Sequence, residues 1–266
     1  MPTTKNPTVE IAILKELLTN LLTLSKNHSL PEAKVKRWQD MLSILPEYAI
    51  NKDGAIAEWI DDRVHDCYDH RHLSHLYPVF PGAEIVDDEK TAKLLPAFKK
   101  ALDLRELGSF CGWSMPHMSA IYSRLGETEK AFDTLNSLAK VCLLENLFTL
   151  GHDFRDMGIT GYDCGNEIRA SVQLDALLSS VNALQEMLIF SSKTTLKLLP
   201  ACPEAFGKGS AELCFTYGRV KMSWSLEEKS CHGTIFADKD ADFTLHLPFC
   251  AKPIGLTLNS GEKFEF

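Results

Sequence analysis

A short segment near residue 70 contains the densest group of side chains that could do chemistry. It reads Asp69-His70-Arg71-His72-Leu73-Ser74-His75-Leu76-Tyr77-Pro78, with three histidines within six residues. Side chains alternate along an extended segment, so His70 and His72 are expected to point the same way. His75 could then complete a three-nitrogen zinc site that keeps an open position for water. The residues alone leave two other interpretations open: histidines that hydrogen-bond a polar ligand, or buried rings in a structural corner.

Two acids and a tryptophan are the other candidates. Asp175 lies within the apolar start of a predicted helix, 172–178, where the helix dipole favours a carboxylate. It is either a first-turn acid that only stabilises the helix, or a base directed at a water molecule. Glu58, followed by Trp59, either lines a cleft or ends an amphipathic helix. Trp113, at another predicted helix start, could stack on the C–H face of a sugar or pack into the core.

The elements that must position these side chains are predicted as helices first and strands last. Apolar residues recur at helical spacing at 9–24, 31–45, 90–106, 114–125, 127–143 and 172–190. Residues 51–85 and 145–169 lose this periodicity, and a long irregular stretch in a compact domain is usually functional. Beyond residue 191, alternating apolar residues predict strands at 212–217, 220–224, 234–236, 243–247 and 256–258. The sequence therefore predicts a helical domain over 1–190 and a small antiparallel β domain over 191–266.

Composition and charge argue against several classes of protein. Hydrophobic residues make up 45% of the chain and charged residues 24%, as is typical of a soluble globular protein. The formal net charge of −8 argues against nucleic acid as a partner, because such binding requires a basic surface. No apolar run reaches the roughly 18 residues that a membrane span needs, and residues 1–7 hold no apolar stretch of signal-peptide type.

The cysteines predict the redox state of the chain. They are scattered without a Cys-x-x-Cys pair, at Cys67, Cys111, Cys142, Cys164, Cys202, Cys214, Cys231 and Cys250. This spacing favours reduced, partly buried thiols over a disulfide framework or a zinc site. Reduced thiols in turn favour a cytoplasmic location slightly.

Several short segments, taken in order along the chain, carry a resemblance to a known family. They are residues 7–12, Glu58-Trp59, 70–78, 81–85, Gly112-Trp113-Ser114, Asn146-Leu147-Phe148 with His152, Gln173-Leu174-Asp175, and 198–203. Together they resemble glycoside hydrolase family 95, the α-L-fucosidase family. The histidine segment is the most specific of them, and the set spans nearly the whole chain.

The resemblance implies part of an (α/α)6 toroid followed by a small antiparallel β-sandwich-like domain. It implies inverting hydrolysis of terminal α-L-fucosides, or of the related α-L-galactosides, on an oligosaccharide or glycan, with no metal or other cofactor. Asp175 then matches the carboxylate beside the attacking water. The substrate-binding residues expected from the resemblance are His70, His72, His75, Glu58, Trp113 and His152.

Two departures from the family pattern limit what the chain is expected to do alone. The family's general acid and activating asparagines lie upstream of the segment that matches Pro7, so a missing N-terminal half of the same protein is the expected partner. The Gly-Asn that usually follows the aspartate is replaced by Ala176-Leu177. We therefore expect the chain alone to be nearly inactive, with Glu58 as the only substitute acid. The alternative is a non-catalytic carbohydrate-binding or assembly module.

Overall fold

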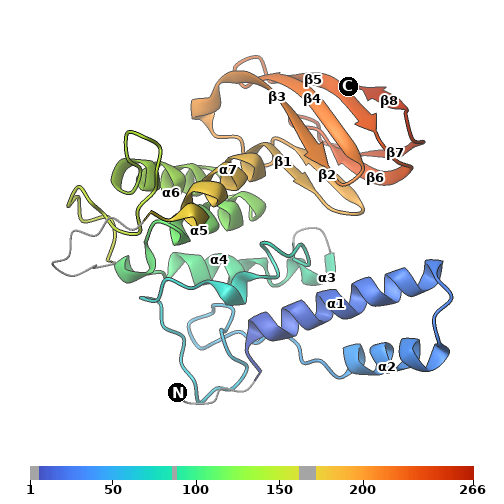
Figure 1. The fold of residues 1–266 in the computed structure, drawn as a ribbon, viewed down its shortest axis with the longest axis horizontal. Coiled ribbons are helices and arrows are strands. Elements are labelled where there is room, and N and C mark those ends of the chain that lie inside the picture. The colour runs from blue at the N-terminus through green and yellow to red at the C-terminus, as the bar shows by residue number, and fades with distance from the viewer. Residues whose placement is uncertain (1–5, 86–88, 162–171) are drawn as a thin grey trace. The chain divides into compact units, whose positions relative to one another are not determined.

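The computed structural model describes residues 6–85, 89–161 and 172–266 (Figure 1). The chain divides into two compact units, Met1–Ser109 and Phe110–Phe266. Helices come first along the chain and strands last. The predicted fold class, mainly α followed by β, is therefore confirmed.

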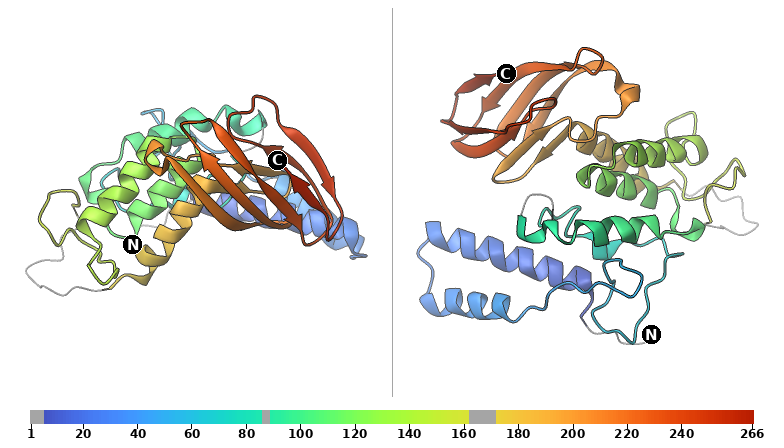
Figure 2. Two further views of the ribbon diagram at one scale, coloured as in Figure 1. Left: turned by 90° about the horizontal axis from the view of Figure 1, so that it is seen from above. Right: turned by 180° about the vertical axis from the view of Figure 1, so that it is seen from behind.

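The first unit begins with two helices, α1 (Thr8–Asn27) and α2 (Glu32–Ser43), which lie side by side in the views of Figures 1 and 2. Both occur where apolar spacing predicts them. The start of α1 is held by Thr8, whose backbone N–H donates to the carbonyl of Glu58 at 2.9 Å. The hydroxyl of Thr8 donates to the carbonyl of Ala57 at 2.6 Å. These bonds fix the segment that contains Glu58 to the first turn of α1.

The rest of the first unit consists of loops and short helices. These helices are η1 (Ser74–Leu76), α3 (Glu89–Ala92), α4 (Leu95–Asp103) and η2 (Leu107–Ser109). A single helix was predicted over 90–106, but the structure has two separate helices there, α3 and α4. Pro96 explains the break, because proline lacks an N–H and fits only in the first turn of a helix. Residues 51–73 form turns and bends, as their lost periodicity predicts.

The second unit begins with three helices, α5 (Ser114–Arg124), α6 (Thr128–Val141) and α7 (Leu174–Leu188). All three occur where helical spacing predicts them. Arg124 of α5 forms a bidentate ion pair with Glu186 of α7. Nε donates to Oε2 at 2.7 Å and Nη2 donates to Oε1 at 2.9 Å. The two side chains are only 10% and 11% exposed. This pair fixes α7 against α5.

The connection from α6 to α7 is described over residues 142–161 and 172–173, and this part contains no helix. Single bridges pair Leu143 with Thr149 and Leu150 with Val172. The predicted irregular stretch is confirmed for these residues. Its remainder, which includes Cys164, lies outside the described residues.

In the described residues, eight strands follow α7 and form two four-stranded sheets (Figure 1). One sheet has the order β1-β2-β6-β7 and the other the order β3-β4-β5-β8. A short turn, η3 (Glu204–Phe206), precedes β3. The strands are β1 (Ile189–Ser191), β2 (Thr195–Leu198), β3 (Lys208–Phe215), β4 (Gly218–Ser225), β5 (Ser230–Ala237), β6 (Ala241–His246), β7 (Ile254–Leu258) and β8 (Lys263–Glu265). Strands β3 to β7 overlap the five predicted runs.

Two features of the sheets differ from the sequence prediction. Strand β2 pairs with β6 in parallel, so the expectation of a wholly antiparallel domain is wrong. Ile189 and Phe190, predicted as the end of a helix, form β1 and pair with Leu198 and Lys197 of β2. The backbone becomes extended at Ile189, with φ −150° and ψ 133°, and branched and aromatic side chains favour strands.

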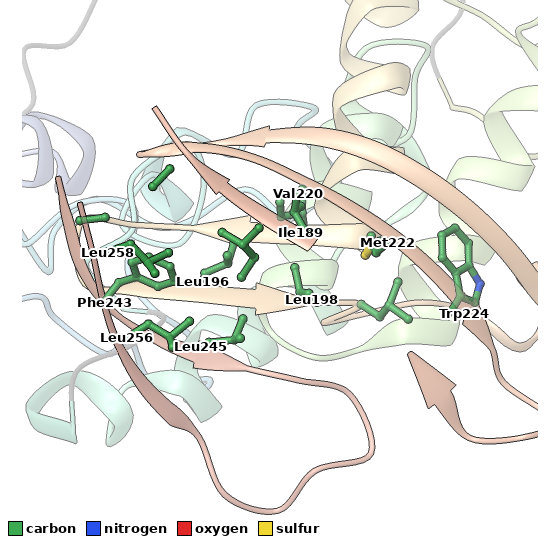
Figure 3. Packing of buried hydrophobic residues seen from close by; sticks show 14 residues of the cluster. Ile189, Leu196, Leu198, Val220, Met222, Trp224, Phe243, Leu245, Leu256 and Leu258 are labelled. Carbon is green, nitrogen blue, oxygen red and sulfur yellow. The ribbon is translucent and has the colours of Figure 1, made fainter. Parts of the chain in front are cut away.

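The two sheets share one apolar cluster, shown in Figure 3. Alternate residues of β4 are buried in it because side chains along a strand alternate between its two faces. These residues are Val220, Met222 and Trp224. A Cβ added at Gly209 of β3 would lie 2.5 Å from Cζ2 of Trp224. A glycine at this position therefore leaves room for the indole ring.

Two further predictions concern the cysteines and membrane-spanning helices. Each cysteine in the described residues is a free thiol, as predicted for them. In the same residues, no helix combines the length and the apolar character that crossing a bilayer requires.

Candidate active site

The three rings of the histidine segment have different surroundings. His70 and His72 are exposed, and their rings lie next to each other, tilted by 32° with centroids 4.6 Å apart, so they lie on the same side as predicted. His75 lies in η1 and is only 1% exposed. Among the described residues, no three His, Cys, Asp or Glu side chains lie close enough together to hold a metal ion. The segment therefore presents two rings at the surface and one in the interior.

Arg105, in the turn after α4, binds the inner side of this segment. Its Nη2 lies 3.1 Å from Nε2 of His75. Its Nη1 donates to the backbone carbonyls of Cys67 and His70, at 3.3 and 3.2 Å, and its Nε donates to the carbonyl of Ala101 at 3.2 Å. A guanidinium is planar and its donors have fixed directions. These bonds therefore hold the backbone immediately before the exposed histidines.

Glu58 is a half-buried carboxyl with an unusual pKa. Burial raises the pKa of Glu58 from 4.5 to about 7, the positive charge of Arg105 opposes this rise, and the negative charge of Asp66 adds to it. Asp66 is itself fixed, because its Oδ1 accepts the N–H of Glu58 at 2.8 Å and its Oδ2 accepts a bond from Asn51. Glu58 therefore changes its charge close to neutral pH, near the guanidinium that holds the histidine segment.

The two exposed histidines favour their neutral form. Partial burial lowers the pKa of His70, and the charges of Arg71 and Arg105 lower it further. For His72, partial burial again comes first, followed by the charges of His70 and Arg71. Each imidazole is thus neutral at pH 7 and can donate one hydrogen bond and accept another. Such a pair suits the hydroxyl groups of an uncharged sugar.

In the second unit, residues far apart in the sequence meet at the start of α7. A Cβ added at Gly112 would lie 2.0 Å from the carbonyl oxygen of Leu150 and 2.8 Å from Oε1 of Gln173. Only a residue without a side chain allows this approach. The N–H of Gln173 donates to the carbonyl of Thr149 at 2.8 Å. These contacts fix the chain two residues before Asp175.

The second unit also contains the remaining predicted site residues. Asp175 is exposed in the first turn of α7, and its Oδ1 accepts the N–H of Ala176 at 3.0 Å. Trp113 is half-buried and immediately precedes α5. His152 is half-buried, and its carbonyl accepts a weak bond from Sγ of Cys142 at 3.4 Å. The structure thus brings Asp175, Trp113 and His152 into one unit, and Glu58 and the three histidines into the other.

Arg105 and Asp66 were not among the site residues predicted from the sequence. A signal for Arg105 exists in the spacing of α4, because Ala97 and Ala101 are buried and Arg105 continues their stripe at the same four-residue interval. An arginine on a buried stripe requires partners for its charge. Asp66 has no such signal, since it is one of the many acids of an irregular loop.

Comparisons with known proteins point to one family. A family model described as the glycosyl hydrolase family 95 catalytic domain matches residues 1–188. The chain is 32% identical over 203 residues to alpha-L-fucosidase 2 of Arabidopsis thaliana, covering 74% of this chain and 22% of that protein. It is 28% identical over 198 residues to the probable alpha-fucosidase A of Aspergillus oryzae, covering 65% of this chain and 25% of that protein. With the probable alpha-fucosidase A of Aspergillus niger it shares 30% identity over 211 residues, 74% of this chain and 25% of that protein. The chain thus spans about a quarter of the length of the curated relatives that it matches.

Proposed function

Because the chain belongs to glycoside hydrolase family 95, we propose that it forms part of a hydrolase that releases terminal α-L-fucose from glycans. Terminal α-L-galactosides are the related alternative substrates. The names of the relatives, which are α-fucosidases, support this substrate class. We further propose that the reaction inverts the configuration at the anomeric carbon. Inversion requires one carboxylate that activates a water molecule and a second carboxyl that protonates the leaving oxygen.

The observation that carries the proposal is the exposed pair of neutral imidazoles, His70 and His72. A neutral pair can accept a hydrogen bond from one sugar hydroxyl and donate a bond to another. Arg105 fixes the backbone that presents the pair, which lowers the entropy lost on binding. We propose that His75 forms the inner wall of the same pocket. Glu58, Trp113 and His152 are proposed as further substrate contacts.

Asp175 is the proposed base. Its exposed carboxylate would take a proton from water, and the oxygen of that water would attack the anomeric carbon on the face opposite the leaving group. The leaving oxygen needs a proton from a general acid. We propose that this acid belongs to polypeptide beyond these 266 residues, because the matched residues make up only 22–25% of the length of the relatives.

The exposed apolar face of α7 is an argument that the chain forms part of a larger helical domain. Leu174, Leu178 and Val181 follow helical spacing and are 63%, 69% and 56% exposed. Apolar stripes of this kind normally pack against other elements. We propose that residues 1–190 form part of an (α/α)6 toroid whose other helices cover this face. Residues 191–266 are proposed as a β-sandwich-like C-terminal domain, in keeping with the cluster that the two sheets share.

The test of sugar binding is a titration of the 266-residue chain with methyl α-L-fucopyranoside, followed by nuclear magnetic resonance (NMR). We expect saturable binding that His72→Ala weakens by roughly tenfold, the effect of losing one good hydrogen-bonding partner. His28→Ala, which replaces an exposed histidine at the end of α1, is the matched control and should bind like the wild type. Equal binding by the wild type and His72→Ala would contradict the proposed pocket.

The test of catalysis uses an aryl α-L-fucoside and Asp175. We expect the chain alone to hydrolyse this compound at the background rate, and robust turnover would show that the general acid lies within it. Asp175→Asn should weaken fucoside binding, whereas Asp133→Asn, an exposed acid of α6, should not. Unchanged affinity in Asp175→Asn would favour the non-catalytic carbohydrate-binding or assembly module instead.

A further inference from the structure

A pocket of about 430 Å³ opens in the first unit, next to the residues that support the histidine segment. Asp66 and Tyr68 line it. Asp66 also bonds the backbone of Glu58, and the guanidinium of Arg105 lies 5.8 Å from the centre of the Tyr68 ring. The volume falls within the roughly 300–1,000 Å³ of small-molecule sites. The pocket is thus large enough for a small ligand and adjoins the proposed fucose contacts through Arg105.

One wall of this pocket is a connected set of polar side chains. Nδ2 of Asn51 donates to Oδ2 of Asp66 and to the hydroxyl of Tyr68, the latter at 2.9 Å. The hydroxyl of Tyr68 donates to Oδ2 of Asp53 at 2.9 Å. Side chains that already bond one another lose little freedom when a ligand binds. The wall therefore offers hydrogen-bonding oxygens in fixed positions.

The pocket also has apolar and aromatic lining. Trp59 is half-buried and lines it, together with Ile50 and Val64. The backbone on each side of the indole is held, because Trp59 pairs with Pro7 in a single bridge and the next N–H, that of Ile60, donates to the carbonyl of residue 6 at 3.2 Å. An aromatic face beside fixed polar groups suits a pyranose, which has apolar C–H faces and a rim of hydroxyls.

The charges around the pocket disfavour an anionic ligand. Three carboxylates line it, from Asp53, Asp62 and Asp66, against the single ammonium group of Lys52. Asp62 is exposed and accessible to a ligand. A phosphate or an acidic sugar would meet net negative charge here, which disfavours its binding. The lining therefore favours a neutral sugar over an acidic one.

We propose that this pocket binds a neutral pyranose of the glycan, namely the sugar that carries the terminal fucose. The assignment rests on the proposed function, since it makes the pocket the subsite next to the one lined by His70 and His72. Trp59 stacks on the C–H face of this pyranose. Asp62 and the polar wall accept hydrogen bonds from its hydroxyl groups.

Lactose, a neutral disaccharide without fucose, is the probe that tests the pocket. In an NMR titration of the 266-residue chain, we expect the indole N–H signal of Trp59 to shift in a saturable way. Trp59→Ala should raise the dissociation constant by roughly tenfold, and Trp59→Phe, which keeps a ring, by less. Trp38→Ala is the matched control, because Trp38 is also half-buried in the first unit but lies on α2 and outside the pocket. It should leave lactose binding unchanged.

The other possible results separate a failure of the pocket from a failure of the proposed function. Equal lactose affinity for the wild type, Trp59→Ala and Trp59→Phe would overturn the pocket. Glucuronate binding as tightly as lactose would show that the ligand class is wrong. Binding of methyl α-L-fucopyranoside without any binding of lactose would contradict the pocket and leave the proposed function intact. Lactose binding without fucoside binding would support the pocket and contradict the proposed function.

Discussion

Nη2 of Arg105 lies 3.1 Å from Nε2 of His75, and this contact joins the end of α4 to the buried part of the histidine segment. An arginine can only donate, so Nε2 of His75 must accept the bond. The same guanidinium donates to the carbonyls of Cys67 and His70. A single side chain therefore fixes the loop on which the proposed sugar contacts lie.

Replacement of Arg105 by lysine should destabilise the protein by about 2–4 kcal/mol. The ammonium group keeps the charge but cannot reproduce the several fixed donors of a guanidinium, so Nε2 of the buried His75 and the carbonyls of Cys67 and His70 lose bonds. Urea unfolding measures the loss. The matched control is Arg63→Lys, because the side chain of Arg63 is exposed and bonds the neighbouring Asp61 at the surface, and its midpoint should equal that of the wild type. Equal midpoints for both variants would show that Arg105 does not fix the loop.

Glu58 should make the stability of the protein depend on pH. Its pKa is about 7 in the folded chain against an ordinary 4.5. Between these values the carboxyl is protonated only in the folded state, so stability should fall as pH rises through this window. Glu58→Gln removes the ionisation and should be more stable than the wild type above pH 7, by about 1–2 kcal/mol after a discount for partial exposure. Unfolding curves at several pH values measure this, and parallel curves for the two proteins would contradict it.

The neighbouring rings of His70 and His72 should titrate as a coupled pair. The charge of His70 helps to lower the pKa of His72, so His70→Ala should raise the pKa of His72 toward 6.5. The ring Cε1–H signal of His72, followed by NMR against pH, measures this value. His65→Ala, an exposed histidine that does not stack on His72, is the control and should leave the pKa unchanged. An unmoved pKa in His70→Ala would mean that the two rings are not in contact in solution.

The nearly buried ion pair of Arg124 and Glu186 should stabilise the fold far more than the exposed pair of Arg219 and Glu212. Glu186→Gln removes the negative charge that faces the nearly buried guanidinium of Arg124, so it should cost about 3 kcal/mol of unfolding free energy. Glu212→Gln breaks the exposed pair with Arg219, whose side chains are 50% and 52% exposed, and should cost roughly 0–1 kcal/mol. Thermal and urea unfolding of the two variants test the difference. Similar losses would contradict the role of the buried pair.

Local periodicity was enough to predict most of the fold. The stripe that became α1 and the alternation that became β4 are regular, because one face of each element is buried. It failed for Ile189 and Phe190, which continue the apolar spacing of α7 but form a strand by pairing with β2. It also missed β8, a short strand defined only by its pairing with β5. Whether such residues form a strand depends on pairing with segments that are distant in the sequence.

The candidate site could be predicted only in part for the same reason. The histidines are visible as a local cluster, but the division between exposed His70 and buried His75 depends on Arg105, thirty residues further along the chain. The unusual pKa of Glu58 depends on burial and on neighbours that no local pattern reveals. Residue types therefore identified the candidates, whereas tertiary contacts assigned their protonation and exposure.

The parallel pairing of β2 with β6 has a consequence for the order in which the chain folds during synthesis. The whole β3-β4-β5 meander lies between these strands in the sequence and belongs to the other sheet. On the ribosome, β2 thus emerges well before its central partner and keeps an unpaired edge while the meander closes through local hairpins. Long-range pairing of this kind is slow and leaves strand edges open to wrong partners. We therefore expect the meander to form early, and we expect the edge of β2 to stay open to wrong partners until β6 has been made.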